Sequence, residues 1–305
     1  MIKSIFFRSA KNEKPVFLLG VGAQKAATTW LYKYLNEHPQ CAMGPIKEQS
    51  VFQTYFQRER FQVSEIVKMQ NLVRYLQASI KQVQDGDPTF NPDQLIAHLD
   101  NLAMNHDLGR YWQTFDTLRT KNPDARVLGD ITPEYAGLTA ENFAEVRQQI
   151  IAQGFAPKVV YLMRDPVERC YSMLRMADRN SVKLGKSVSR PAHERFVEDS
   201  TSAWSEIYTR YERTIAALET AFQPDEIFYG FYETFLTVEE LGRCCAFLGI
   251  DQVPAKFESK VNWSPREIEL EEVALQSVRD FYRETYNFCM QRFGSDFIGR
   301  IWKYT

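Results

Sequence analysis

Short continuous apolar runs alternate along most of this chain with longer amphipathic stretches. The continuous runs are typical of strands buried on both faces of a parallel sheet, and they lie at 16–19, 126–128, 158–163 and 226–229. The amphipathic stretches predict helices at 28–35, 140–152, 167–176, 204–221, 237–248 and 270–293. Alternating strands and helices predict an α/β fold, in which a parallel sheet is flanked by helices.

Residues 54–125 interrupt this alternation. They are rich in helix formers and contain few β-type runs, so we predict two to four helices, broken at 86–88 and at 91–92. Residues 178–193 are expected to form an exposed loop, and 254–270 an irregular segment. We therefore predict a single α/β domain over 15–305 with a helical insertion at 54–125.

Composition narrows the possible functions only modestly. The 305 residues and 44% hydrophobic content are ordinary for a globular protein with a proper core. A net charge of −2 gives no support to a nucleic-acid partner or a polybasic membrane surface, so any anion site must be a local cluster of positive charge. The short N-terminal apolar patch is unlike a signal peptide, and no run approaches the 18 apolar residues of a membrane span.

Cysteine and histidine usage points to a protein with free thiols and without a metal. The five cysteines are Cys41, Cys170, Cys244, Cys245 and Cys289. Their odd number and the lack of C-x-x-C spacing favour a reducing, cytoplasmic compartment. Cys244 and Cys245 are expected to be small core residues of a helix. The histidines show no metal-ligand spacing, so we expect no metal site.

The segment 16–35 carries the clearest chemical signal. A buried strand runs into a loop of small residues, and the loop opens an amphipathic helix with the hydroxyls of Thr28 and Thr29 at its start. A helix N-terminus with free N–H groups and a nearby lysine, here Lys25, is an anion site, and phosphate is the usual anion. The alternative is a plain strand-to-helix turn with a solvated Lys25.

The spacing excludes the two commonest phosphate loops. A Walker A loop reads G-x-x-x-x-G-K-S/T, but Lys25 precedes Thr28 by three positions. The glycines Gly20 and Gly22 do not complete a G-x-G-x-x-G fingerprint well. We interpret the segment as a P-loop-like phosphate loop of a third kind.

A second strand-to-helix turn adds another candidate anion contact. Arg164 directly follows the strand 158–163, and Ser172 lies eight positions further on. Arginine supplies a fork of donors suited to phosphate, although Asp165 as a cap before Pro166 is also a common helix start. Because parallel strands end at one edge of a sheet, this turn and the first loop suggest one ligand with two phosphate groups.

Together these residues resemble the sulfotransferases that use 3′-phosphoadenosine 5′-phosphosulfate (PAPS), especially the heparan sulfate, Golgi-type branch and its bacterial relatives. GAQKAATTWL resembles their loop for the 5′-phosphosulfate, and YLMRDPVERCYSM resembles their strand and helix for the 3′-phosphate. KEQSVF, GDITPEY, FYETFL and LGRCCAFLGI are supporting similarities. The resemblance covers roughly 15–52 and 126–293 and implies PAPS as donor, adenosine 3′,5′-bisphosphate as product, and no metal.

The resemblance also implies roles for individual residues. Lys25 would contact the leaving phosphate and the sulfuryl group, and Glu48 would be the general base, unless it is a solvated carboxylate or a partner of Lys47. Trp30 and Tyr232 would stack near the adenine, unless they are packed in the core. Arg266 and Lys260 would contact a phosphate, unless they belong to an ordinary basic surface. The implied donor contacts are Gly22, Ala23, Gln24, Lys25, Ala26, Ala27, Thr28, Thr29, Trp30, Arg164, Ser172, Tyr232 and Arg266.

The chain also departs from the family pattern. Ile131 stands where the family's E-K-S/T-P-x-Y motif has its lysine, which weakens a heparan-like polyanionic acceptor, and the R-K-G-x-x-G segment of cytosolic members is absent. His98 and His106 are alternative candidates for the base. Both lie in the insertion, where an ordinary surface histidine is the simpler interpretation.

The expected reaction is transfer of a sulfuryl group to a hydroxyl or amine of a small molecule, glycan or lipid. From its position, the insertion 54–125 is expected to form an acceptor-binding wall or lid. Aromatic residues of the insertion suggest an acceptor with apolar parts, although helix packing explains them at least as well. These residues are Tyr55, Phe56, Tyr75, Tyr111 and Trp112. The alternatives are a nucleotide-dependent kinase and a nucleotide-binding module without chemistry.

Overall fold

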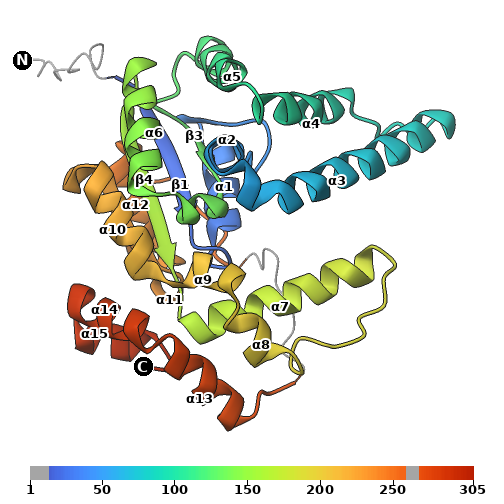
Figure 1. Cartoon of the computed structure of the whole chain (residues 1–305). Coiled ribbons are helices and arrows are strands. Elements are labelled where there is room, and N and C mark those ends of the chain that lie inside the picture. The colour runs from blue at the N-terminus through green and yellow to red at the C-terminus, as the bar shows by residue number, and fades with distance from the viewer. Residues whose placement is uncertain (1–13, 259–267) are drawn as a thin grey trace, which may run out of the picture.

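A five-stranded parallel sheet forms the centre of the molecule (Figure 1). The computed structural model describes residues 14–258 and 268–305. The strand order is β2-β3-β1-β4-β5, with every neighbouring pair parallel. The strands are β1 (Val16–Gly22), β2 (Cys41–Met43), β3 (Val127–Ile131), β4 (Ala156–Met163) and β5 (Ile227–Phe231). The predicted α/β fold is confirmed.

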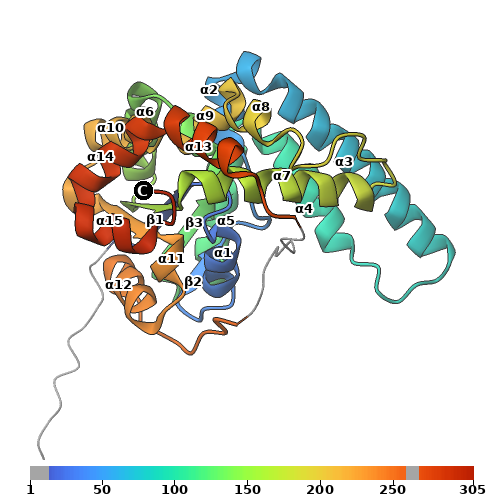
Figure 2. The ribbon, with the colours of Figure 1, turned by 90° about the horizontal axis from the view of Figure 1, so that it is seen from below.

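Helices cover both faces of this sheet. Figure 2 shows α1 (Thr28–Asn36) and α12 (Val238–Leu248) on one side, and α6 (Ala140–Ala152) and α10 (Tyr211–Ala221) on the other. The central strand β1 is therefore enclosed, and Phe17, Leu18 and Leu19 are fully buried, as their continuous apolar run predicts. Cys244 and Cys245 on α12 are buried core residues, as expected.

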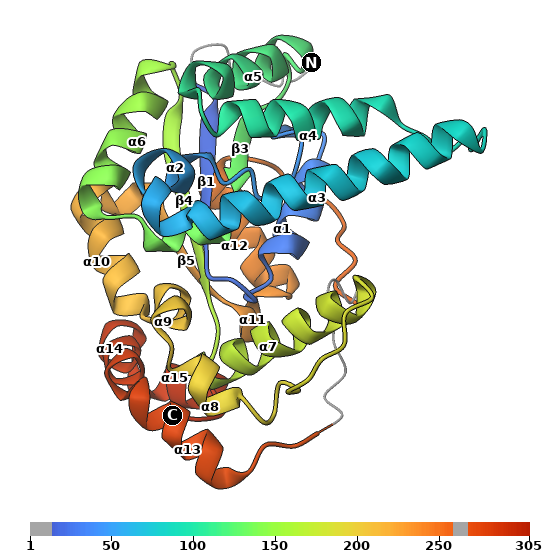
Figure 3. The same cartoon turned by 45° about the vertical axis from the view of Figure 1, so that its right-hand side comes forward.

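The insertion forms an arm beside the sheet. Its helices are α2 (Val51–Phe56), α3 (Arg58–Gln84), α4 (Pro92–Met104) and α5 (Leu108–Lys121). In Figure 3, α3 and α4 extend well beyond the body of the molecule. The predicted breaks are confirmed, and Asn91 caps α4 with Pro92 at its first position. Over the described residues, no helix is both long and apolar enough to cross a membrane.

The base of the insertion belongs to the core. The ring of Phe17 on β1 packs against Tyr111, Trp112 and Phe115 of α5, with centroids 6.4, 5.2 and 4.8 Å away. Tyr111 is fully buried and Trp112 is 6% exposed. Helix packing therefore accounts for these two aromatics, which the sequence had left open as acceptor contacts.

The chain after β3 contains more helices than periodicity predicted. Here the remaining elements are η1 (Pro133–Gly137), α7 (Pro166–Lys183), α8 (Phe196–Ser200), α9 (Ala203–Thr209), η2 (Pro224–Glu226), α11 (Tyr232–Phe235), α13 (Glu272–Phe281), α14 (Arg283–Phe293) and α15 (Ser295–Ile301). The predicted helix 167–176 continues to Lys183, into the segment 178–193 that we expected to be a loop.

Two predicted helices are each broken once, so those predictions were wrong. The stretch 204–221 breaks at Arg210, whose guanidinium lies near Glu206 and Glu284. The stretch 270–293 breaks at Tyr282, whose hydroxyl donates to the carbonyl of Ser200 at 2.6 Å. Both breaks are accompanied by contacts from distant segments, which hydrophobic periodicity does not report.

Gly129 in β3 allows the close approach of β1. A Cβ at this position would clash with the carbonyl oxygen of Leu18 on the neighbouring strand. We expect Gly129→Ala to lower the free energy of unfolding by about 1–3 kcal/mol, as overpacking of a core does. Urea denaturation measures this change.

Gly299→Ala is the matched control. Gly299 is exposed on α15, and the nearest atom to a Cβ there is 3.9 Å away. Alanine at this position should be neutral or slightly stabilising, because it is the better helix former. Equal unfolding free energies for the two variants would contradict the close β1–β3 approach.

Candidate active site

The loop between β1 and α1 is a tight turn at the carboxyl edge of the sheet. Its first residue, Ala23, donates its N–H to the carbonyl of Leu162 on β4 at 2.5 Å, and Ala26 donates to Ala23 at 3.2 Å. Lys25 and Ala27 both have left-handed backbones, with φ of 72° and 67°. Such conformations are uncommon outside glycine and persist only where the surroundings fix them.

This turn delivers the N-terminus of α1 to the same edge. Ala27 is the residue that precedes the helix, and within the described part of the chain no side chain caps α1 and no acidic residue stands in its first turn. The leading N–H groups of a helix lack intrahelical partners and carry partial positive charge. The predicted helix start at Thr28 and Thr29 is confirmed, and the binding of an anion there stays a prediction.

The second predicted turn converges on this loop. Arg164, which directly follows β4, donates from Nη1 to the carbonyl oxygen of Lys25 at 3.2 Å. Its guanidinium lies 4.2 Å from the ring centre of Tyr232 and 3.4 Å from Glu168 Oε2. Three segments that are far apart in the sequence, around Lys25, Arg164 and Tyr232, thus meet at one edge of the sheet.

The side chain of Lys25 points to α7. Its Nζ lies 3.3 Å from the sulfur of Met176, which is one turn beyond Ser172. Ser172, Arg175, Met176 and Arg179 are spaced by three, four and seven residues, so they share one helical face. The contact with Met176 turns that face toward the loop.

Lys25 is surrounded by positive charge. The pKa of Lys25 is lowered from its ordinary 10.5 to about 8, first by burial and then by the nearby charges of Arg179, Arg164 and Arg175, in that order. The carboxylate of Glu48 acts in the opposite direction, so Glu48 also lies within electrostatic reach of Lys25. Sequence reasoning missed Arg175 and Arg179, although their helical spacing from Ser172 was available as a signal.

A buried carboxylate fixes Arg164. Asp165 caps α7 by accepting the N–H groups of Val167 and Glu168, at 2.9 and 3.2 Å. It also accepts the hydroxyl of Tyr286 at 2.9 Å and the N–H of Tyr304 at 3.0 Å. Burial raises the pKa of Asp165, while these donors favour its ionised form. The cap predicted for Asp165 is confirmed, and it serves to position Arg164.

A second buried carboxylate, Asp130 on β3, supports the segment that carries Glu48. Asp130 accepts the hydroxyls of Thr132 and Tyr135 at 2.8 and 2.5 Å. Those two hydroxyl oxygens in turn accept the N–H groups of Ser50 and Val51, at 3.3 and 3.2 Å. Burial raises the pKa of Asp130, and its hydrogen bonds oppose that rise. The acidic residue of GDITPEY thus holds the 48–51 segment against the sheet.

Glu48 itself is half-exposed and forms an ion pair with Lys47. This contact is one of the alternatives that the sequence left open. The insertion also reaches this segment, because Asn101 of α4 donates to the carbonyl of Gln49 at 2.9 Å. Glu48 is therefore held between the sheet edge and the insertion, with its carboxylate facing the Lys47 ammonium.

Other predicted site residues lie elsewhere or are not described. Trp30 is 6% exposed, nearly parallel to Tyr34 and Phe257 at 5.8 and 5.5 Å, which favours core packing for its ring. His98 and His106 are exposed on the insertion. Lys260 and Arg266 lie outside the described residues. Ile131 is buried and would meet any side chain at Gly20.

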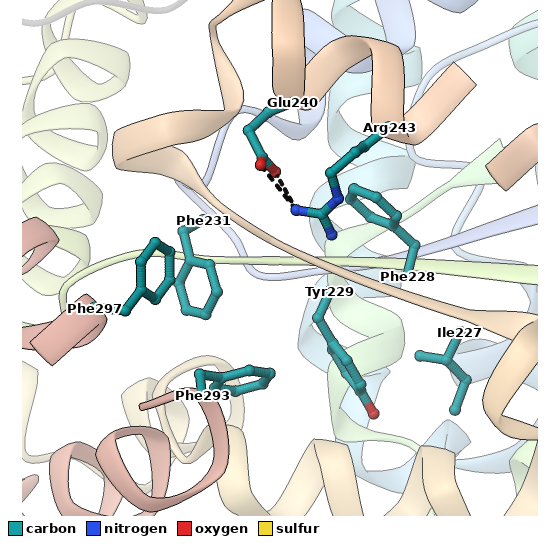
Figure 4. A pocket seen from close by; sticks show the side chains of 8 residues that line it. All are labelled: Ile227, Phe228, Tyr229, Phe231, Glu240, Arg243, Phe293 and Phe297. Carbon is teal, nitrogen blue, oxygen red and sulfur yellow. Dashed lines mark hydrogen bonds and ion pairs between the residues drawn. The ribbon is translucent and has the colours of Figure 1, made fainter. Parts of the chain in front are cut away.

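A different hollow lies at the β5 edge of the sheet. It measures about 340 Å³ and is lined mainly by aromatic rings from β5, α14 and α15 (Figure 4). Arg243 in its wall is already paired with Glu240 at 2.8 Å. A lining of this kind does not suit a phosphate ligand, so the loop beside Lys25 is the better candidate active site.

Comparison with known proteins identifies the family. The model of the sulfotransferase family matches residues 15–254, so this chain belongs to that family. The sulfotransferase from Alicyclobacillus acidocaldarius has a similar structure, with 19% identity, a TM-score of 0.50 and coverage of 94% of each chain. This likeness shows a shared fold. No curated protein sequence matches the chain.

Two further solved structures are more distant. The sulfotransferase domain from the Synechococcus PCC 7002 olefin synthase is 16% identical, with a TM-score of 0.46 over 89% of this chain and 96% of that one. The sulfotransferase domain from the curacin biosynthetic pathway is 15% identical, with a TM-score of 0.44 over 90% of this chain and 98% of that one.

The lowered pKa of Lys25 is open to measurement. In the ligand-free protein, acetylation of Lys25 should rise with pH through about 8, because only the neutral amine reacts and burial among cations favours it. Arg179→Gln should move this rise toward higher pH by removing one of those cations. Peptide mass spectrometry after acetic anhydride treatment gives the profile. Exposed Lys33 is the internal control, and identical profiles for the two lysines would contradict the cluster.

Proposed function

We propose that this member of the sulfotransferase family transfers a sulfuryl group from PAPS to a hydroxyl or amine and releases adenosine 3′,5′-bisphosphate. One observation carries the proposal: the Arg164 guanidinium touches the backbone of Lys25, at 3.2 Å. Two independent candidate phosphate positions therefore lie within reach of one ligand. A donor with phosphate groups at both its 3′ and 5′ positions fits this pair of sites.

The residues available suit the two ends of such a donor. The loop amides, Thr28 and Thr29 at the start of α1 would hold the 5′-phosphosulfate, with Lys25 over its reactive end. Arg164 and Ser172 would hold the 3′-phosphate, and the Tyr232 ring stacked on Arg164 would border the base. We include Gly22, Ala23, Gln24, Ala26 and Ala27 as loop contacts, where the backbone comes close to the ligand.

The chemistry follows the pattern of phosphoryl transfer. The acceptor oxygen or nitrogen forms a bond to sulfur while the bond from sulfur to the 5′-phosphate oxygen breaks, in line. Lys25 neutralises the charge that grows on the leaving phosphate, and Glu48 takes the proton of the acceptor. Anionic donor groups favour the ammonium form of Lys25, so donor binding should raise its pKa above the ligand-free value of about 8.

The insertion would form the acceptor side of this site. Its Asn101 holds the Glu48 segment, and its helix α3 extends outward on the same side of the molecule as α7 (Figures 1 and 3). The acceptor would then be a small molecule, glycan or lipid bound between donor and insertion. The five free thiols, among the described residues, are consistent with a cytoplasmic location.

Thermal stabilisation by nucleotides tests the donor. Adenosine 3′,5′-bisphosphate at 100 times its Kd should add about 2.7 kcal/mol to the free energy of unfolding, and ATP and adenosine 5′-phosphate should add much less. Arg164→Ala should remove this preference, since it deletes a 3′-phosphate contact. Equal stabilisation by all three nucleotides would contradict the proposal.

Glu48→Gln separates chemistry from binding in the same experiment. It should leave stabilisation by the bisphosphate unchanged, because the proposal gives Glu48 a role toward the acceptor and none in holding the donor, and should slow sulfuryl transfer by roughly 10²- to 10⁴-fold. Transfer of a ³⁵S label from PAPS measures the rate. Full activity of Glu48→Gln would show that another group is the base.

A further inference from the structure

The peptide bond between Arg164 and Asp165 is held from both sides by side chains of other elements. It lies between the end of β4 and the start of α7. The carbonyl of Arg164 accepts the hydroxyl of Tyr211 on α10 at 2.6 Å. The N–H of Asp165 donates to Glu233 Oε1 on α11 at 2.9 Å. These two contacts fix the peptide plane, and with it the direction in which the Arg164 side chain leaves the backbone.

Trp302 connects the two side chains that hold this peptide bond. Its indole Nε1 donates to Glu233 Oε2 at 3.3 Å, and its ring centre lies 6.1 Å from that of Tyr211. The ring also packs against Phe231 and Tyr286, at 5.9 and 5.7 Å, and the side chain is 2% exposed. Carboxylate oxygens that are withdrawn from water need donors, so the indole N–H supports the second oxygen of Glu233.

Glu233 also acts on the other end of the Arg164 side chain. Its chain neighbour Tyr232 carries the ring whose centre lies 4.2 Å from the Arg164 guanidinium, and both residues belong to the short helix α11. Glu233 therefore influences Arg164 by two routes. One is the peptide bond after Arg164, and the other is the ring that stacks on its guanidinium.

This connection comes from a part of the chain beyond the residues that the family model matches. The model covers 15–254, whereas Trp302 directly follows α15 and lies 69 positions after Glu233. The same segment contributes the N–H of Tyr304, which donates to Asp165 Oδ2 at 3.0 Å. Residues 302–304 thus contact both acidic side chains that support the Arg164 turn.

We propose that Trp302 is a positioning residue for the 3′-phosphate site and that it acts through Glu233 on Arg164. This inference rests on the proposed function, in which Arg164 holds the 3′-phosphate, and extends it to a residue that does not touch the donor. Trp302 and Glu233 keep the guanidinium at the loop, where its Nη1 donates to the carbonyl of Lys25 at 3.2 Å. A preorganised guanidinium binds phosphate more tightly than a mobile one, because less conformational freedom is lost on binding.

Calorimetric titration with two nucleotides tests the role of Trp302. Burial raises the pKa of Glu233 to about 7, so measurement at pH 8 keeps this carboxylate ionised. Trp302→Phe retains an aromatic ring and removes the N–H donor. It should weaken the binding of adenosine 3′,5′-bisphosphate by roughly 3- to 10-fold, the range expected for one hydrogen bond. The Kd of adenosine 5′-phosphate should change less than twofold, because the loop that holds the 5′-phosphate is not altered.

Trp112→Phe is the matched control. Trp112 is 6% exposed, and its indole N–H donates to Gln149 Oε1 at 3.0 Å, between α5 and α6. The substitution removes the same atoms from another buried site and should leave the Kd of both nucleotides unchanged. Glu233→Gln is the second test variant and gives the same comparison if Trp302→Phe folds poorly. It should also weaken the bisphosphate selectively.

The Arg164→Ala background shows whether the effect passes through Arg164. There Trp302→Phe should cause no further loss of bisphosphate binding. A further loss in that background, equal weakening of both nucleotides, or the same loss in Trp112→Phe would overturn the inference. Each of these results leaves the proposed function standing while the native protein prefers the bisphosphate over ATP and adenosine 5′-phosphate. Lack of that preference in the native protein would overturn both.

Discussion

The concentration of positive charge around Lys25 is the constraint on which the rest of this structure depends. Lys25 lies near Arg164, Arg175 and Arg179, and burial together with their charges brings the pKa of Lys25 down to about 8. The chain as a whole carries a net charge of −2, so this cluster is local and is opposed by the mutual repulsion of its members. Holding it together requires a rigid frame around the loop, and an anionic ligand would relieve the repulsion.

Two buried carboxylates help to provide that frame. Asp165 ties the start of α7 to Tyr286 and to the backbone of Tyr304 near the C-terminus, so the residue after β4 has a fixed place. Asp130 uses Thr132 and Tyr135 to hold the segment after Glu48 at the end of β3. A buried carboxylate is stable only when donors surround it, which explains why each of these two has several. The parallel sheet then brings both anchored segments to the edge where β1 delivers Lys25.

The sequence predicted the parts of this site whose signal is local. The buried β1 strand, the small-residue loop and the R-D-P turn are each readable over a few residues, and the parallel sheet places them at one edge. Arg175 and Arg179 gain their role only because α7 docks on Lys25 through Met176, and no local pattern encodes that contact. The breaks at Arg210 and Tyr282 likewise accompany contacts with distant segments. For Tyr111 and Trp112 the sequence left acceptor contact and helix packing open, and the structure shows that they pack against Phe17 in the core.

A crystal structure of the complex with adenosine 3′,5′-bisphosphate tests the central claim most directly, namely that the loop and the start of α7 form one site for a doubly phosphorylated nucleotide. The account predicts a single bound molecule, with its 5′-phosphate on the loop amides beside Lys25 and its 3′-phosphate within hydrogen-bond distance of Arg164 and Ser172. A nucleotide bound with only one phosphate in this region, or bound elsewhere on the molecule, would contradict it.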